Sequence, residues 1–218
     1  MSATTAPTPK APGKPRRGLL VGIAAGIAVL IAMALDTTVV QIGSDGDIRQ
    51  QAFSPDKYGD EQFPRIQTFI DERAVDAATL GPAVLADKAE AAKRYGTASS
   101  TGAIMPVRLT GVAGEGKSGV YDLSVEGVPA DIHVRVQTGP AINGTDLRDA
   151  TGDIEFGKFK NQIEFQNAGS GINRAMKKQI LDPTDTTNLT GKTVEVVGVF
   201  RLINPKNWLI TPSRLAVK

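Results

Sequence analysis

A long polar connector between two groups of strand-like runs does most to constrain the fold of this chain. It extends from Gly139 to Leu181 and lacks the period-two alternation found on either side of it. Three alternating runs precede the connector and two follow it, and apolar positions between Asn161 and Leu181 predict a helix within it. Three strands, a helix and two strands is the element order of the five-stranded OB-type Greek-key barrel. The sequence therefore predicts a mainly β, α+β domain with an OB-fold-like five-stranded barrel.

Alternation of apolar and polar residues defines the five expected strands. The runs are Ile104–Thr110, Tyr121–Val125, Ile132–Gln137, Thr193–Leu202 and Trp208–Val217. Glycine-rich or Asn-Pro turns separate neighbouring runs, and Gly198 inside the fourth run predicts a bulge or sharp bend. Strands of this kind have one face in the core and one face in water.

Two amphipathic helices are expected before the strands. Phe63, Ile66 and Ile70 fall at helical spacing, with Pro64 at a helix-start position. A second helix is predicted from about Pro82 to Gly96. We interpret both as a layer covering one face of the sheet; a partner-binding helical arm is the alternative.

An apolar run at the front of the chain predicts one transmembrane helix. Gly18 to Leu35 contains 18 residues without a charged side chain, about 27 Å of helix against a hydrocarbon core of roughly 30 Å. Basic residues precede the run, so we expect the N-terminus in the cytoplasm and the remainder outside the inner membrane, periplasmic or extracellular. A signal peptide cleaved near Ala34, after the small-x-small triplet 32–34, and a buried soluble helix are alternatives.

These patterns divide the chain into five parts. We expect a disordered cytoplasmic tail at 1–17, a membrane anchor at 18–40, a linker at 41–58, a helical layer at 59–97 and an OB-like β domain at 98–218.

Composition excludes several classes of site. The chain contains no cysteine and one histidine, so disulfides, thiolate chemistry and a multi-histidine metal site within one chain are ruled out. Four of the 25 basic residues and none of the 23 acidic ones lie in residues 1–35, which leaves 21 against 23 in residues 36–218. A near-neutral domain with 5% aromatic residues does not resemble a nucleic-acid binder.

Two catalytic motifs are matched in letters only. Gly111 to Ser118 spells G-x-x-x-x-G-K-S, but an alternating strand follows it where a phosphate loop needs a helix, so we expect a hairpin turn. Ser170 lies between glycines without a nucleophile-elbow context, and the only base, His133, is expected on the wetted side of a strand. We therefore expect no catalytic residue, cofactor or metal.

A cluster of acids in the connector leaves one enzymatic alternative open. The cluster consists of Asp146, Asp149, Asp153 and Glu155. Thr145 followed by acids is typical of a short capped helical turn. A small hydrolase using Asp149 and Asp153 would need two carboxylates at a fixed separation across a cleft.

Four segments of the chain resemble one bacterial family. They are GPAINGTDLRDA (139–150), FGKFKNQIEF (156–165), GKTVEVVGVF (191–200) and NPKNWLITPSRLAV (204–217). They are similar to the family catalogued as domain of unknown function 2291, described as predicted periplasmic lipoproteins, and the resemblance extends from about Val39 to the C-terminus. It implies an exported, membrane-tethered OB-like domain encoded beside carbohydrate ABC transporters. The lipid-bearing cysteine of the family is absent here, so the run at 18–35 would serve as the tether.

The same segments contain the candidate contact residues for a ligand or partner. The seven candidates are Arg148, Asp149, Phe156, Phe159, Asn161, Gln162 and Trp208. Planar amides suit sugar hydroxyls and aromatic rings can stack on a sugar face, whereas Arg148 can equally tie the connector to the barrel.

We interpret the chain as a non-catalytic, membrane-anchored accessory or interaction domain. Its expected partners are the membrane, through residues 18–40, and components of a sugar ABC transporter, with no nucleic acid. A small-molecule binding protein for sugar-like ligands is the alternative, followed by an uncharacterised hydrolase.

Overall fold

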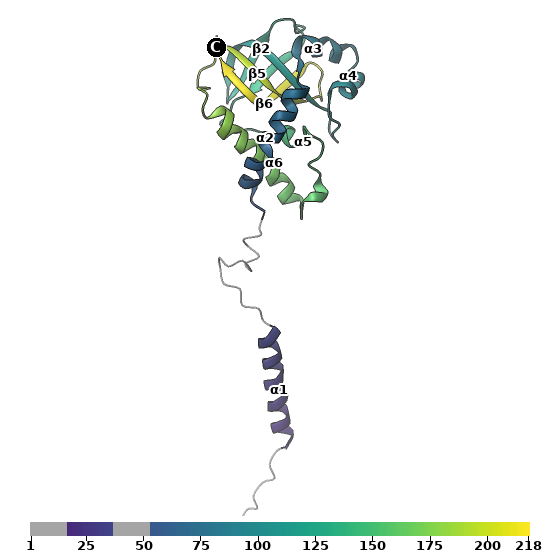
Figure 1. Cartoon of the computed structure of the whole chain (residues 1–218), viewed down its shortest axis with the longest axis vertical. Helices are drawn as coiled ribbons and strands as arrows, with labels where there is room; N and C mark the ends of the chain where they lie inside the picture. The colour runs from purple at the N-terminus through teal and green to yellow at the C-terminus, as the bar shows by residue number, and fades with distance from the viewer. Residues whose placement is uncertain (1–16, 37–52) are drawn as a thin grey trace, which may run out of the picture. The chain divides into compact units, whose positions relative to one another are not determined.

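The computed structural model describes residues 17–36 and 53–218, in two separate units, residues 1–52 and 53–218 (Figure 1). The first unit contains one described helix, α1 (Arg17–Asp36). No helix within these described ranges has both the length and the apolar character that a membrane crossing requires. The expected tail except Arg17, most of the expected linker and the last residues of the expected anchor lie outside the described ranges.

Six strands form one sheet in the second unit. They are β1 (Val75–Asp76), β2 (Ile104–Lys117), β3 (Val120–Val125), β4 (His133–Gln137), β5 (Thr193–Arg201) and β6 (Asn207–Val217). The strands pair in the order β1-β2-β3-β4-β6-β5, and β2 also pairs with β5, so the five long strands form a closed circuit. The β4–β6 and β1–β2 pairs are parallel and the others antiparallel.

The expected order of elements is confirmed, with local additions. The two-residue strand β1 was not expected. The predicted irregularity at Gly198 is present as a register shift between β5 and β6. The stretch from Gly111 to Ser118 lies in β2 and its turn, and β3 follows directly at Val120, as expected for a hairpin. Ser118 and Gly119 at the turn both have positive φ, 53° and 75°.

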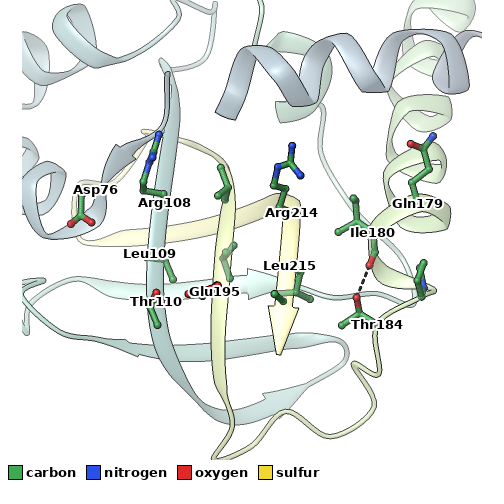
Figure 2. A pocket seen from close by; sticks show the side chains of 14 residues that line it. Asp76, Arg108, Leu109, Thr110, Gln179, Ile180, Thr184, Glu195, Arg214 and Leu215 are labelled. Atoms are coloured by element: carbon green, nitrogen blue, oxygen red, sulfur yellow. Dashed lines mark hydrogen bonds between the residues drawn. The ribbon is translucent and has the colours of Figure 1, made fainter. Parts of the chain in front are cut away.

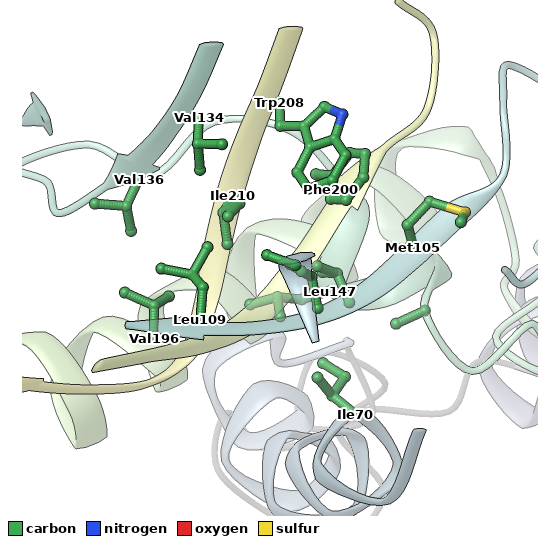
Figure 3. Close-up of a cluster of buried hydrophobic side chains, with 14 of the residues drawn as sticks. Ile70, Met105, Leu109, Val134, Val136, Leu147, Val196, Phe200, Trp208 and Ile210 are labelled. Carbon is green, nitrogen blue, oxygen red and sulfur yellow. The ribbon is translucent and has the colours of Figure 1, made fainter. Parts of the chain in front are cut away.

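The core fills the interior of the strand circuit. Apolar side chains of β2, β4, β5 and β6 point at one another there (Figure 3). Trp208 is fully buried and stacks on Phe200 with ring centroids 4.4 Å apart. Ile70 from a helix and Leu147 from the connector join the same cluster, which binds the outer elements to the strands.

The helical layer differs from its prediction in its boundaries. α2 (Pro55–Arg73) begins at Pro55, where Ser54 accepts a hydrogen bond from the backbone of Lys57, so Pro64 lies inside the helix. The single helix expected from Pro82 to Gly96 is wrong: α3 (Ala77–Ala86) and α4 (Lys88–Tyr95) replace it. Asp87 separates them because its carboxylate caps the first turn of α4.

The connector folds into four short elements. They are α5 (Asp146–Asp149), the 3₁₀ turn η1 (Phe156–Lys158), α6 (Gln162–Met176) and the π-helical turn η2 (Lys177–Leu181). α6 continues through Gly169 and Gly171, although glycine has a low intrinsic helix preference. Gly171 lies against α2, where a Cβ atom would be 1.9 Å from the Pro55 carbonyl oxygen. The glycine therefore permits the close α2–α6 crossing seen in Figure 1.

Candidate functional site

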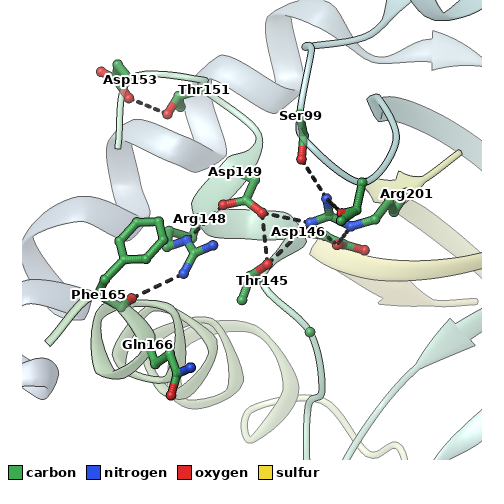
Figure 4. Close-up of polar contacts among 12 residues, drawn as sticks. Ser99, Thr145, Asp146, Arg148, Asp149, Thr151, Asp153, Phe165, Gln166 and Arg201 are labelled. Atoms are coloured by element: carbon green, nitrogen blue, oxygen red, sulfur yellow. Dashed lines mark hydrogen bonds and ion pairs between the residues drawn. The ribbon is translucent and has the colours of Figure 1, made fainter. Parts of the chain in front are cut away.

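Arg201, at the end of β5, holds the connector against the strands. Its five N–H donors are all used, as Figure 4 shows in part. The acceptors are Oδ1 of Asp146 at 3.0 Å, Oδ2 of Asp149 at 2.7 Å, and the hydroxyls of Thr145, Ser99 and Thr101 at 3.2, 2.7 and 2.9 Å. One guanidinium thus joins β5, α5 and the segment before β2.

Arg148 ties the same turn to α6. Its Nε donates to Oδ1 of Asp149 at 2.8 Å and its Nη1 donates to the carbonyl of Phe165 at 3.2 Å. The guanidinium also lies over the Phe165 ring, 3.7 Å from its centroid. The Arg148 residue is only 8% exposed. The two predicted contact residues Arg148 and Asp149 are therefore engaged within the fold. Asp149 bonds Arg201 of β5, whereas Arg148 joins two parts of the connector and does not tie it to the barrel.

The two acids around Arg201 have pKa values shifted in opposite directions. Burial would raise the pKa of Asp149, but hydrogen bonds from Arg148, Arg201 and Thr145 outweigh it, so the pKa is lowered. Burial raises the pKa of Asp146, and Arg201 offsets this only in part. Neither acid lines a described cavity, so the network has the character of a structural clamp.

Five aromatic rings gather where the connector meets the start of α2. Phe53, Tyr58 and Phe159 contact one another with centroids 5.4 to 5.6 Å apart. Phe165 lies beside Phe159 at 5.4 Å, and Phe156 packs edge-on against Phe165 at 5.8 Å. The chain has 11 aromatic residues, so nearly half of them lie in this one cluster.

The rings of Phe53, Tyr58 and Phe159 line a cavity of about 380 Å³, which we call the aromatic pocket. Its lining residues are Phe53, Tyr58, Gln62, Arg65, Asp153, Ile154, Lys158, Phe159 and Glu164. Arg65 donates to Asp153 at 2.6 Å and, through Nη2, to the side-chain oxygen of Gln62 at 2.9 Å. The pocket combines ring faces with planar amide, carboxylate and guanidinium groups, and its size suits a small ligand.

Charges around the pocket act on its titratable groups. Burial raises the pKa of the Tyr58 phenol, with Arg65 opposing that effect and Asp153 adding to it. Hydrogen bonds from Arg65 and Thr151 lower the pKa of Asp153. At neutral pH the pocket therefore contains a neutral phenol beside an ionised carboxylate.

The other predicted contact residues have different places. Asn161 caps α6 by accepting a hydrogen bond from the backbone of Glu164 at 2.9 Å, and Gln162 is the exposed first residue of that helix. Phe156 is 51% exposed at the edge of the ring cluster, outside the pocket lining. Trp208 is fully buried in the core, so the expectation of a ring available for stacking on a sugar is wrong.

Sequence reasoning missed Arg201 and the contribution of α2. No local pattern distinguishes Arg201 within its strand, and only its acceptors in a distant segment give it a role. Phe53 and Tyr58 lay in a stretch interpreted as linker. The Ser-Pro sequence at 54–55, typical of a capped helix start, was the available signal for α2.

The strand face on which OB folds bind oligonucleotides and oligosaccharides is polar in this domain. The outward residues of β3 and β4 are Asp122, Ser124, His133 and Arg135. None is aromatic, whereas single-stranded nucleic acid is bound on OB folds by stacking of bases on aromatic rings. Among residues 17–36 and 53–218, no three His, Cys, Asp or Glu side chains are arranged to hold a metal ion.

Comparisons with known proteins agree with this architecture. A family model described as "Predicted periplasmic lipoprotein (DUF2291)" matches residues 25–216. The chain belongs to the DUF2291 family. A search of curated proteins found no match. Membership indicates an envelope-associated, periplasmic protein, and the absence of cysteine distinguishes this member from a lipoprotein lipidated through that residue.

A solved structure shares the fold. The crystal structure of an OB-fold protein from Thermotoga maritima superimposes with a TM-score of 0.60 at 17% sequence identity. The match covers 77% of this chain and 99% of that chain. This likeness establishes an OB-type fold for the strand circuit and says nothing about its ligand.

Proposed function

We propose that this DUF2291 member is a non-catalytic, membrane-tethered binding domain of the cell envelope, and that the aromatic pocket takes a small sugar-like ligand. The observation that carries the proposal is the pocket itself. Rings of Phe53, Tyr58 and Phe159 border a cavity of about 380 Å³ that also contains amide, carboxylate and guanidinium groups.

Sugar rings offer two kinds of surface to such a pocket. Their C–H faces pack against aromatic rings, and their hydroxyls both donate and accept hydrogen bonds. Tyr58 and Phe159 would supply the ring faces, while Glu164 and Gln62 would bond hydroxyls. The Arg65–Asp153 pair is preformed at 2.6 Å, so it would present fixed donors and acceptors without having to reorganise.

The acids of the connector support binding rather than hydrolysis. A glycosidase needs one protonated and one ionised carboxyl across a cleft. Asp146 and Asp149 have the divergent pKa values that such a pair requires, but Arg201 binds both and neither faces a described cavity. Asp153 does line the pocket, yet its pKa is lowered by Arg65, which opposes a role as general acid.

Calorimetric titration of the full chain with neutral mono- and disaccharides tests the proposal. The protein should be kept in a detergent without a sugar headgroup, because a glycoside detergent would compete. Phe159→Ala should weaken binding about fivefold to tenfold, the equivalent of roughly 1 to 1.4 kcal/mol. Phe156→Ala is the matched control, since that ring lies outside the lining. Equal effects of the two variants, or chemical conversion of the sugar, would refute the proposal.

The tether proposal rests on the sequence of the first unit. Gly18 to Leu35 has no charged side chain, basic residues precede it, and no cysteine is available for lipid attachment. Protease added to spheroplasts should digest the domain, and the intact protein should sediment with membranes. Deleting residues 18–35 should abolish both results. An intact wild-type protein in the cytosolic fraction would contradict the tether.

Association with a sugar ABC transporter is a further proposal, supported by the family resemblance alone. Crosslinking in native membranes, with residues 18–40 retained, should recover transporter subunits or their sugar-binding protein. Growth of a deletion strain that is unchanged across a panel of carbohydrates would count against it.

A further inference from the structure

A second cavity lies outside the strand circuit, over the outward-facing side chains of β2, β5 and β6. We call this cavity of about 540 Å³ the trough (Figure 2). Its residues are Asp76, Arg108, Leu109, Thr110, Gln179, Ile180, Pro183, Thr184, Glu195, Val196, Val197, Arg214, Leu215 and Ala216. None of them belongs to the aromatic pocket or to the Arg201 network.

Strand register places two arginines in one row of the trough, with Val197 between them. Arg108 pairs with Val197 and Val197 pairs with Arg214, so both guanidinium groups rise from one row of the sheet. Figure 2 shows both side chains pointing to the same side of the strands. The neighbouring row consists of Thr110, Glu195 and Ala216. A cationic row therefore adjoins a row of hydroxyl and carboxylate groups.

α2 holds the two arginines in position. Nε and Nη2 of Arg108 donate to the carbonyls of Ala74 and Asp71, at 2.9 and 3.0 Å. Nε of Arg214 donates to Oδ2 of Asp71 at 2.7 Å, and its Nη2 lies 2.6 Å from the same oxygen. The Nη1 group of each arginine has no partner within residues 17–36 and 53–218. Two oriented donor groups are thus left for an external acceptor.

The acids near the arginines are engaged in part: Asp71 binds Arg214 through Oδ2, while its Oδ1 is buried with no hydrogen-bond partner among the described residues. Glu195 pairs with Lys218, and Asp76 caps α3 by accepting from the backbone of Ala78 at 2.9 Å. Ionised carboxylates remain good acceptors for hydroxyl groups while paired in this way. Gln179 and Thr110 add polar groups, and Val197 and Ile180 add apolar surface.

We propose that the trough is a second binding site, for an acidic sugar in which one carboxylate accompanies several hydroxyls. Arg108 and Arg214 would bind the carboxylate through their Nη1 groups, since planar guanidinium donors match carboxylate oxygens. Glu195, Thr110 and Gln179 would bond the hydroxyls, and Val197 would contact the C–H face. The site is independent of the aromatic pocket and stands or falls separately from it.

Titration of the full chain with glucuronate, glucose and inorganic phosphate, in detergent without a sugar headgroup, tests the assignment. Glucuronate should bind at least about tenfold more tightly than glucose or phosphate, because only it uses both rows. Arg214→Gln should weaken glucuronate about tenfold, and adding salt should weaken it in the wild type. Arg135→Gln, in β4 and outside the trough lining, is the control and should have no effect.

Three results would overturn the site. One is the absence of glucuronate binding, and another is phosphate binding as tight as that of glucuronate, which would leave the hydroxyls without a role. The third is an equal effect of Arg214→Gln and Arg135→Gln in folded proteins. Phe159→Ala should leave glucuronate binding unchanged, so failure of the aromatic pocket and failure of the trough give different patterns.

Discussion

Replacing Arg201 with methionine should cost far more stability than its position at a strand end suggests. The variant keeps most of the side-chain volume and removes the guanidinium that binds Asp146 and Asp149. The side chains of the arginine and both acids are only 14 to 16% exposed. Removing one member of such a group leaves charge in a poorly solvated place, which costs about 3 kcal/mol or more.

A matched variant separates burial from charge. Arg65→Met also removes an arginine–aspartate pair, with the same 2.6–2.7 Å contact, but the side chains of Arg65 and Asp153 are 46% and 51% exposed. Exposed pairs contribute at most about 1 kcal/mol. The structure therefore predicts a difference of about 2 kcal/mol or more between two chemically identical substitutions.

Urea unfolding followed by tryptophan fluorescence measures this difference. Trp208 is the only tryptophan, and it is buried against Phe200, so its emission should report loss of the core. Asp146→Asn added to Arg201→Met should restore part of the loss, because it removes a carboxylate left without its ion-pair partner. Equal losses for the Arg201 and Arg65 variants, or no restoration by Asp146→Asn, would refute the reasoning.

Three further predictions concern stability. Gly171→Ala should cost about 2 kcal/mol or more, because its Cβ would lie 1.9 Å from the Pro55 carbonyl oxygen, while Gly157→Ala, with open space around it, should change the unfolding free energy by no more than about 0.5 kcal/mol. Asp149 has a lowered pKa in the folded state, so its contribution to the free energy of unfolding is fully present above the unfolded-state pKa of about 3.9 and is lost as pH falls through the folded-state pKa. Asp149→Asn should therefore make the unfolding free energy less dependent on pH in the acid range. A pH dependence equal to that of the wild type would contradict this. Asp87→Ala should remove the α4 cap and cost about 1 kcal/mol by urea unfolding, and no loss would show that the cap is dispensable.

The strands could be predicted because their signal is local. Alternation at Tyr121, Leu123 and Val125, or at Val134 and Val136, follows from one wetted and one buried face. The order of five strands around a helical connector then limited the fold to few topologies. The pairing that closes the circuit, β2 with β5, joins residues about 90 positions apart in the chain, and no local pattern indicates it.

Helix boundaries and site residues depended on distant contacts. α6 passes through Gly169 and Gly171 although glycine has a low intrinsic helix preference. Close packing on α2 requires the glycine at 171, whereas Gly169 faces Thr145 and Arg148. Trp208 has a side chain of the type that stacks on sugars, yet it lies on the inward-facing side of β6 and is buried in the core. Phe159 lines a cavity, but two of the rings that it meets, Phe53 just before α2 and Tyr58 within it, come about 100 residues earlier in the chain.

The most direct test of the binding function is an NMR experiment on the full chain with the tightest neutral saccharide of the panel. The account predicts saturable binding of an unaltered sugar, with nuclear Overhauser effects from its C–H protons to the ring protons of Tyr58 and Phe159. Saturable binding with such effects only to residues outside the aromatic pocket, no binding by any saccharide, or turnover of the sugar would contradict it.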